Sequence, residues 1–320
     1  DACRLDRDYF YDRGMHKIDW KGMREKYAPL AARVNSRGEL SDVLAQMVGE
    51  LSALHHFVRG GEFRTGPDQV FPAFLGADLA VEPAGWRVKK IYQADPDLVE
   101  RVSPLAKPDV NVLAGELITR INNAPLAGVT EPQALLRNLV GKQVLLHVQN
   151  AAGEERRVIV NPISADSDAD LRYHDWQYSR RLYVEKRSNG RLGYVHMRAM
   201  GNENYTEFAR SYYPSHTTEG LVIDVRNNRG GNIDSWILSR LMRKAWFYWQ
   251  PRVGKPTWNM QFAFRGPMVT LCNEATASDG EAFSEGFRRL GLGKVIGTRT
   301  WGGAIWLSSS NVLVDKGIAS

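Results

Sequence analysis

The stretch TLCNEATASDGEAFSEGF, residues 270–287, changes character in its middle. It begins as an apolar strand, becomes small and polar around Ser278 and Asp279, and continues with the spacing of a helix. A serine in such a turn normally caps the helix or fills the turn. Here the small neighbours Ala277 and Gly280 leave the hydroxyl accessible, and amides at a helix start can stabilise an oxyanion. The stretch therefore predicts a strand, a turn and a helix, with Ser278 as a candidate nucleophile.

Strand-like and helix-like segments alternate on both sides of this stretch. The strand-like segments are GRLGYVHM, GLVIDVR, MVTLCNE and KVIGTRT, and the helical patterns between them are NENYTEFARSYY, DSWILSRLMRKAWFY and EAFSEGFRRLG. This alternation predicts a sheet covered by helices, in which chemistry collects where carboxyl ends of strands meet helix starts. The loops NNRGGNID and NEATASDG lie at such ends. In the first of them, Gly230 and Gly231 can bring bare backbone and an amide against a reacting carbonyl.

The chain before this domain has two further segments. Residues 6–56 have helical spacing, and Ser41 is the expected N-cap of the helix written LSDVLAQMVGELSALHHF. The Gly- and Pro-rich stretch 59–72 ends this helical domain. Residues 74–163 alternate in the manner of strands, with one helix predicted over PQALLRNLVGK.

The polar stretch ISADSDADLRYHDW, residues 163–176, reads as a linker to the last segment. A chain of 320 residues with 43% hydrophobic residues can bury a core in each of several domains. We therefore predict an α+β / α/β multidomain chain: an N-terminal helical domain, a mostly β module and a C-terminal α/β catalytic domain. The predicted bounds are 1–72, 73–163 and 164–320.

Composition argues against several functions. The 42 basic residues are interspersed with 36 acidic ones, so the net charge of +6 does not favour a nucleic-acid partner. Only Cys3 and Cys272 occur, far apart, and neither a disulfide framework nor a zinc site is expected. This usage favours a reducing compartment such as the cytoplasm, and a periplasmic location stays open if a signal peptide precedes Asp1. No stretch approaches the roughly 18 to 20 apolar residues that span a bilayer, so no membrane segment is expected.

A serine hydroxyl needs a base to act as a nucleophile near neutral pH. His147 lies inside a predicted strand, and His174 and His196 lie near predicted strand ends, where structural roles are expected. His55 and His56 end the helical domain, from which a side chain can project across a domain interface. Spacing alone leaves the choice open among all seven histidines, which also include His16 and His216. A lysine can also serve as the base of a serine.

Two resemblances concern single domains. The segments LGADLAV, SPLAKPDVNVLAGELITRINNAPL and VTEPQALLRNLVGKQVLLHVQ resemble a PDZ domain, a fold that commonly captures a peptide end as an added strand. The last domain resembles the carboxyl-terminal processing proteases, which carry a base lysine in a phrase like TFGK, one strand after the nucleophile. This chain reads GTRTWGG, with Gly303 at that place. A Ser–Lys dyad of that type is therefore not expected.

A closer resemblance, to the tricorn protease family, covers essentially the whole chain. The phrases that recur in the family's order are DRDYFYDRGMHKIDWKGMREKYAPL, GELSALHH, LRYHDW, GYVHM, LVIDVRNNRGGN, NEATASDGEAF and IGTRTWGG. The chain resembles the catalytic core of that family. The resemblance implies a ClpP/crotonase-like catalytic domain and a serine endopeptidase that shortens peptides released by larger proteolytic machines. It further implies a homo-oligomer, a hexamer in the family, with peptide substrates and neither metal nor organic cofactor.

The resemblance also assigns roles to single residues. It implies Ser278 as the nucleophile, His55 as the base, and the backbone amides of Gly231 and Asp279 as the oxyanion hole, with an acyl-enzyme intermediate. It further implies that Asp279 and Gly230 bind the substrate. The family's corresponding aspartate favours basic residues before the scissile bond, through charge-assisted hydrogen bonds, and reaches in from a neighbouring subunit.

Two departures from the family pattern leave alternatives open. The family places a serine immediately before its histidine and a glutamate well beyond TWGG; here Leu54 occupies the first position, and Ser320 is reached before any such glutamate. A third catalytic residue is therefore expected beyond Ser320. One alternative is a PDZ-containing scaffold that binds peptides without cleaving them, and the other is a Ser–Lys processing protease.

Overall fold

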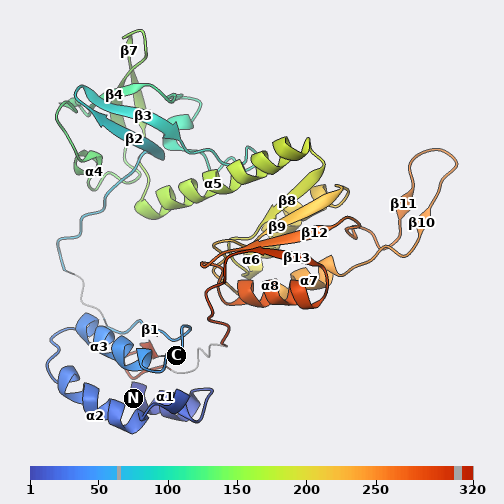
Figure 1. The fold of residues 1–320 in the computed structure, drawn as a ribbon. Helices are drawn as coiled ribbons and strands as arrows, with labels where there is room; N and C mark the ends of the chain where they lie inside the picture. The colour runs from blue at the N-terminus through green and yellow to red at the C-terminus, as the bar shows by residue number, and fades with distance from the viewer. Residues whose placement is uncertain (63–65, 306–311, 320) are drawn as a thin grey trace. The chain divides into compact units, whose positions relative to one another are not determined.

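Two structural units make up the chain in a computed structural model that describes residues 1–62, 66–305 and 312–319 (Figure 1). One unit joins Asp1–Thr65 with Arg187–Ser320, and the other is Gly66–Lys186. Helices and strands are mixed in the first, and the second combines an antiparallel sheet with most of a long helix. The predicted α+β multidomain class is confirmed.

Three helices form the N-terminal part of the first unit. They are α1 (Ala2–Tyr9), α2 (Trp20–Ala31) and α3 (Arg37–Gly49), and a 3-10 turn, Met15–Lys17, connects the first two. Their apolar faces meet in a small core that includes Trp20, Met47, Leu51 and, from the far end of the sequence, Leu313. Strand β1 (Val58–Arg59) pairs antiparallel with β14 (Ile318–Ala319), so a segment late in the sequence joins the N-terminal helices.

The predicted helix cap at Ser41 is wrong. Helix α3 begins earlier, and the hydroxyl of Ser36, which lies in extended backbone, accepts a hydrogen bond from the Glu39 amide at 3.2 Å. Ser41 lies inside the helix, where the amides around it are already bonded, and its hydroxyl accepts from the Arg37 guanidinium. Within the predicted helical stretch the helix ends at Gly49, which leaves the two neighbouring histidines on a turn.

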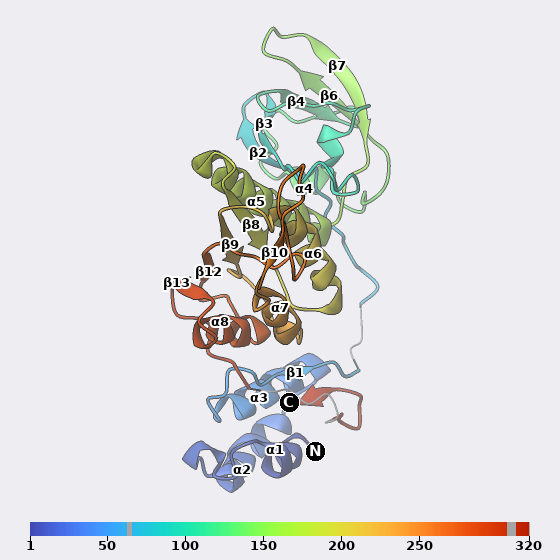
Figure 2. The same ribbon diagram turned by 90° about the vertical axis from the view of Figure 1, so that its right-hand side faces the viewer.

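A four-stranded parallel sheet forms the centre of the C-terminal part, in the order β13-β12-β9-β8 (Figure 2). Its strands are β8 (Leu192–His196), β9 (Gly220–Asp224), β12 (Met268–Cys272) and β13 (Gly293–Gly297). The helices between them are α6 (Asn202–Ser215), α7 (Asp234–Leu241) and α8 (Asp279–Arg289). Phe208 of α6, Ile237 of α7 and Phe283 of α8 are buried in one core with the strands. The sheet covered by helices that the alternating segments predict is therefore confirmed, and its strands are parallel.

The helix predicted over residues 234–248 is shorter than expected. Helix α7 ends at Leu241, and a hairpin of β10 (Tyr248–Trp249) and β11 (Thr257–Trp258) follows. Tyr248, Trp249 and Trp258 are bulky aromatic residues, a type that favours strands, where their side chains pair with those of the neighbouring strand. The Tyr248 and Trp258 rings lie 5.3 Å apart, and the Arg265 guanidinium lies 4.1 Å from the centre of the Trp258 ring.

The second unit is an antiparallel sheet in the order β2-β3-β4-β6-β7, with β5 beside β4. Its strands are β2 (Ala77–Glu82), β3 (Gly85–Ile91), β4 (Leu117–Ile121), β5 (Ala124–Pro125), β6 (Val144–Gln149) and β7 (Glu155–Val160). A 3-10 turn, Pro104–Ala106, precedes β4. The helix predicted over PQALLRNLVGK is only α4 (Pro132–Leu135), because Asn138 and Gly141 adopt the left-handed conformation, which ends a helix.

The stretch predicted as a linker, residues 163–176, is instead the first half of helix α5 (Ala165–Ser188). It contains neither glycine nor proline, and its early aspartates suit the positive end of the helix dipole. Of the four acidic residues of this stretch, Asp166 and Asp170 are exposed and the other two are buried. Buried Asp168 accepts from the Gly76 amide at 3.2 Å, and Asp175 accepts from the Gln93 amide at 3.0 Å.

Candidate active site

Ser278 lies in the turn that precedes α8, in a strained backbone conformation. Its φ and ψ are 54° and −119°, a region that residues other than glycine rarely adopt. The position is that of an N-cap, yet the side chain makes no capping hydrogen bond. A serine in strained backbone between a strand and a helix, whose hydroxyl has no hydrogen-bond partner among the described residues, is a candidate nucleophile.

Two loops are bound to each other around this serine. The Thr276 hydroxyl donates to the Val225 carbonyl at 2.8 Å, and the Ala277 amide donates to the Asn228 carbonyl at 2.9 Å. The fully buried Asn228 side chain donates to the Met197 carbonyl at 2.8 Å, at the end of β8. Hydrogen bonds therefore join the Ser278 turn and the paired-glycine loop at the carboxyl ends of three strands.

Gly230 and Gly231 are glycines for steric reasons. A Cβ on Gly230, whose φ is +83°, would lie 2.5 Å from the Ser278 Cβ, and one on Gly231, whose φ is +154°, would lie 1.9 Å from the Met200 carbonyl oxygen. The Gly230 amide donates to Asn228 at 2.8 Å and its carbonyl accepts from Met200 at 2.7 Å. The assignment of Gly230 to substrate binding stays a prediction that this geometry does not support, since Gly230 instead makes room for the serine.

Two backbone amides beside Ser278 are available to a ligand. Within the described residues the amides of Gly231 and Asp279 have no hydrogen-bond acceptor, and Gly231 is exposed. The Asp279 amide is the first of helix α8, whose positive dipole end adds to its attraction for an anion. This pair has the composition of an oxyanion hole.

The Asp279 side chain turns toward the start of α7. Its Oδ2 accepts from the amides of Ile233 at 2.8 Å and Asp234 at 2.9 Å. Burial raises the pKa of the Asp279 carboxyl to about 6, the two amides pull it down, and the nearby Asp234 carboxyl raises it further. At neutral pH the site therefore carries a half-buried negative charge next to the serine.

The two neighbouring histidines have different surroundings. The His56 imidazole is buried, with Nε2 2.8 Å from Asp6 Oδ1, and stacks on Phe10. The His55 Nδ1 lies 2.7 Å from the Ile305 carbonyl oxygen, and its ring meets the Trp301 ring edge-on at 5.5 Å. Because a carbonyl only accepts, His55 Nδ1 carries the proton and Nε2 is left as the basic nitrogen. No hydrogen bond joins His55 to Ser278 in the described part of the chain.

Other histidines have structural surroundings. His147 Nδ1 lies 2.8 Å from Glu155 Oε1 within the β6–β7 ladder. Burial lowers the pKa of His196, at the end of β8, to about 4, so this ring is neutral. The prediction that His174 lies near a strand end is wrong, because it lies within α5.

The segment after β13 is fixed to α8 by Glu281, a residue that the sequence analysis did not select. The Glu281 carboxylate accepts from the amides of Ser278 at 3.0 Å, Gly302 at 2.6 Å and Gly303 at 3.0 Å. The spacing from Ser278 to Glu281 matches the S-x-x-E signature of a helix start, which was the available signal. A side chain at Gly303 would strike the Trp301 ring at 2.2 Å, so the place of the processing proteases' lysine has no room for one here. Leu54 is half exposed and reaches toward Gly302.

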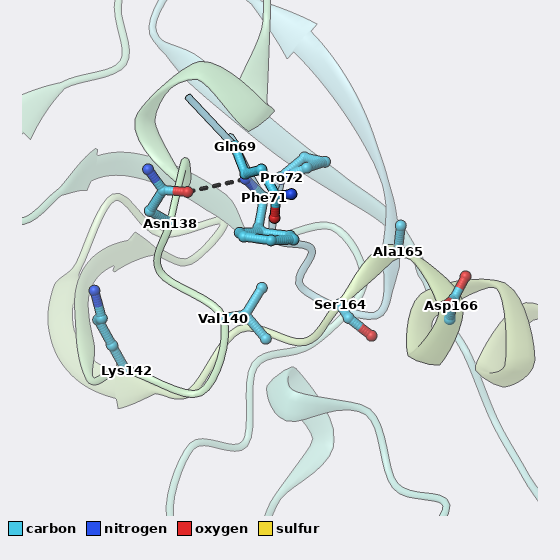
Figure 3. A pocket seen from close by; sticks show the side chains of 9 residues that line it. All are labelled: Gln69, Phe71, Pro72, Asn138, Val140, Lys142, Ser164, Ala165 and Asp166. Carbon is cyan, nitrogen blue, oxygen red and sulfur yellow. Dashed lines mark hydrogen bonds between the residues drawn. The ribbon is translucent and has the colours of Figure 1, made fainter. Parts of the chain in front are cut away.

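The second unit has a pocket of its own, of about 570 Å³ (Figure 3). Phe71 and Val140 form its apolar wall, and Lys142 and Asp166 lie at opposite sides. The wall is held in place because Asn138 donates its amide to the Phe71 carbonyl at 2.8 Å and accepts from the Phe71 amide at 2.9 Å. The pocket can take an apolar side chain next to a charged group.

Neither a metal site nor a membrane helix is found in the described ranges. No three His, Cys, Asp or Glu side chains converge as a cation would need. None of the helices there has both the length and the apolar content to cross a bilayer.

Serine hydrolases on α/β domains use groups of the kinds found here: a serine in strained backbone, two amides without an acceptor among the described residues, and a histidine whose Nδ1 faces a carbonyl. Family models match the descriptions peptidase family S41 at residues 191–320, tricorn protease PDZ domain at 73–165 and tricorn protease C1 domain at 1–49. The chain belongs to the tricorn protease family.

Individual relatives are similar over nearly the whole chain. Tricorn protease homolog 1 of Streptomyces coelicolor is 37% identical over 98% of this chain, and the tricorn protease of Thermoplasma acidophilum is 31% identical over 98%. A crystal structure of the tricorn protease matches 99% of the chain with a TM-score of 0.89 at 30% identity. The chain spans 29% of the length of each of these two relatives and 31% of the crystallised chain.

Proposed function

We propose that this chain is the catalytic core of a serine endopeptidase that hydrolyses oligopeptides produced by earlier proteolysis. The observation that carries the proposal is the Ser278 hydroxyl, which caps no helix amide and is held in strained backbone, beside the amides of Gly231 and Asp279, which have no acceptor among the described residues. A structural serine would use its hydroxyl as a cap and relax its backbone.

The proposed reaction has two halves. The Ser278 oxygen attacks the peptide carbonyl carbon while His55 Nε2 takes the hydroxyl proton, and the amides of Gly231 and Asp279 bind the resulting oxyanion. The C–N bond then breaks, His55 returns the proton to the leaving amine, and an ester joins the acyl group to Ser278. Water, deprotonated by His55, attacks this ester, and the carboxylic acid leaves as the serine recovers its proton.

A fluorophosphonate probe tests the proposal on the full-length gene product. The probe is expected to form a single adduct, at Ser278, which peptide mapping by mass spectrometry identifies. The same preparation is expected to cleave unstructured peptides of about ten residues. Peptide binding without any adduct would contradict the proposal and favour the peptide-binding scaffold, for which the pocket of the second unit is the supporting observation.

A preference for lysine or arginine before the scissile bond is part of the proposal. Its support is the negative charge of Asp279, to which Asp234 lies close enough to raise the pKa. We expect Asp279→Asn to lower the ratio of kcat/KM for an arginine peptide to that for its leucine analogue by about tenfold, since a charge-assisted hydrogen bond is lost. The backbone amide is unchanged, so oxyanion binding affects both peptides alike.

The same ratio is expected to depend on pH. The Asp279 carboxyl, whose pKa burial raises to about 6, loses its charge as the pH falls through that value, so the arginine preference weakens toward pH 5. Any effect of pH on the reaction steps that the two peptides share cancels in the ratio. An arginine preference that is the same at pH 5 and pH 7.5, or that survives Asp279→Asn, would assign the preference elsewhere.

The assembly and the compartment are proposed from the resemblance. We propose a homo-oligomer of six copies in the cytoplasm, acting on peptides without metal or organic cofactor. Light scattering of the full-length protein and cell fractionation check the first two statements, and activity after dialysis against a chelator checks the third.

A further inference from the structure

The Glu281 carboxylate is an unusual buried charge. The residue is only 8% exposed, and among the described residues no lysine or arginine pairs with it. A buried carboxylate is costly unless hydrogen bonds replace its water. Three backbone amides and the first turn of α8 supply that replacement.

The three amides belong to two different parts of the candidate site. One is the amide of Ser278 itself, so Oε2 of Glu281 holds the strained residue whose hydroxyl is the proposed nucleophile. The other two, from Gly302 and Gly303, lie in the segment that follows β13. A single carboxylate therefore fixes both.

The segment held by Glu281 also orients His55. The Trp301 amide donates to the Thr276 carbonyl at 3.0 Å, and the Ile305 amide donates to the Gly303 carbonyl at 2.8 Å. Through this short turn the Ile305 carbonyl lies against His55 Nδ1. The Trp301 ring, from the same segment, meets the His55 ring edge-on. The tautomer of the base thus depends on a backbone carbonyl whose position depends on Glu281.

We propose that Glu281 is the positioning residue that holds the nucleophile and the support of the base in one geometry. It touches neither substrate nor reacting atoms; it acts through the backbone of Ser278 and of residues 302–305. The proposal rests on the proposed serine peptidase function.

The test compares two substitutions on the same helix. Glu281→Gln keeps the shape of the side chain but places an NH₂ group against backbone amides that are themselves donors. Glu285→Gln, one turn further along the helix, removes only exposed ion pairs with Arg288 and Arg289. We expect Glu281→Gln to lower kcat about 100-fold, because small displacements of reacting groups have effects of that order, with KM changed less than threefold. The fluorophosphonate reaction is expected to slow by a similar factor, and Glu285→Gln to match the wild type.

Hydrogen exchange provides the structural readout. Amides of residues 299–305 are expected to exchange faster in Glu281→Gln and unchanged in Glu285→Gln. If wild-type protein forms no adduct, the proposed function fails. If it does, and folded Glu281→Gln reacts at the wild-type rate, only the positioning role is overturned. Should Glu281→Gln not fold, Glu281→Asp, which keeps the charge but is one methylene shorter, is expected to show the same loss of kcat, and a wild-type kcat in that variant also overturns the role.

Discussion

Replacing Ser278 with alanine is expected to lower kcat for peptide hydrolysis on the order of 10⁶-fold. The oxygen that would form the acyl bond is removed, and loss of a nucleophile of this kind has an effect of that size. What activity remains would come from the amides of Gly231 and Asp279 acting on bound substrate and water. The strained backbone at position 278 is as unfavourable for alanine as for serine, so the fold is expected to be retained.

The matched control is Ser284→Ala, one turn and a half along α8. Its hydroxyl is buried and donates to the Gly280 carbonyl at 2.8 Å, so it is already used within the helix. We expect Ser284→Ala to keep kcat and to lose at most a little thermal stability. Steady-state kinetics of both variants on one peptide give the comparison, and wild-type turnover by Ser278→Ala would remove this serine from the mechanism.

The catalytic fold could be predicted because its signals are local and repeated. Each parallel strand is a short apolar run, and each of the first three is followed by a helical pattern. The errors arose where a local signal has two meanings. A polar run without glycine or proline, residues 163–176, has the polarity of a linker, but within it Asp168 and Asp175 make buried contacts of α5. Ser36 and Ser41 are both plausible caps, and only the helix register decides between them.

The candidate site was predictable only where the type of residue itself carries a signal. Ser278 and the paired glycines stand out by composition, and the S-x-x-E spacing indicates Glu281. The support of His55 has no such signal, because it is a backbone carbonyl, 250 residues away, that every residue type possesses. Buried Asn228 is likewise silent in the sequence, since its role depends on two carbonyl and amide groups that only the fold brings together.

His55→Gln is expected to lower kcat on the order of 10⁶-fold as well, because loss of the base from a nucleophile and base pair has about the same effect as loss of the nucleophile. The geometry specifies why this histidine qualifies. Its Nδ1–H is held by the Ile305 carbonyl, which leaves Nε2 free of a proton and able to accept one from Ser278.

The neighbouring residue supplies the control. His56→Gln keeps a polar side chain near Asp6 but loses the imidazole that stacks on Phe10, so we expect lower thermal stability with kcat unchanged. The rate of the fluorophosphonate reaction is expected to distinguish the two variants as kcat does: it is slow in His55→Gln and normal in His56→Gln. A slow reaction in His56→Gln with a normal one in His55→Gln would make His56 the base. It would contradict the role argued for His55, because the Ile305 carbonyl would then fix the tautomer of a histidine with no part in the reaction.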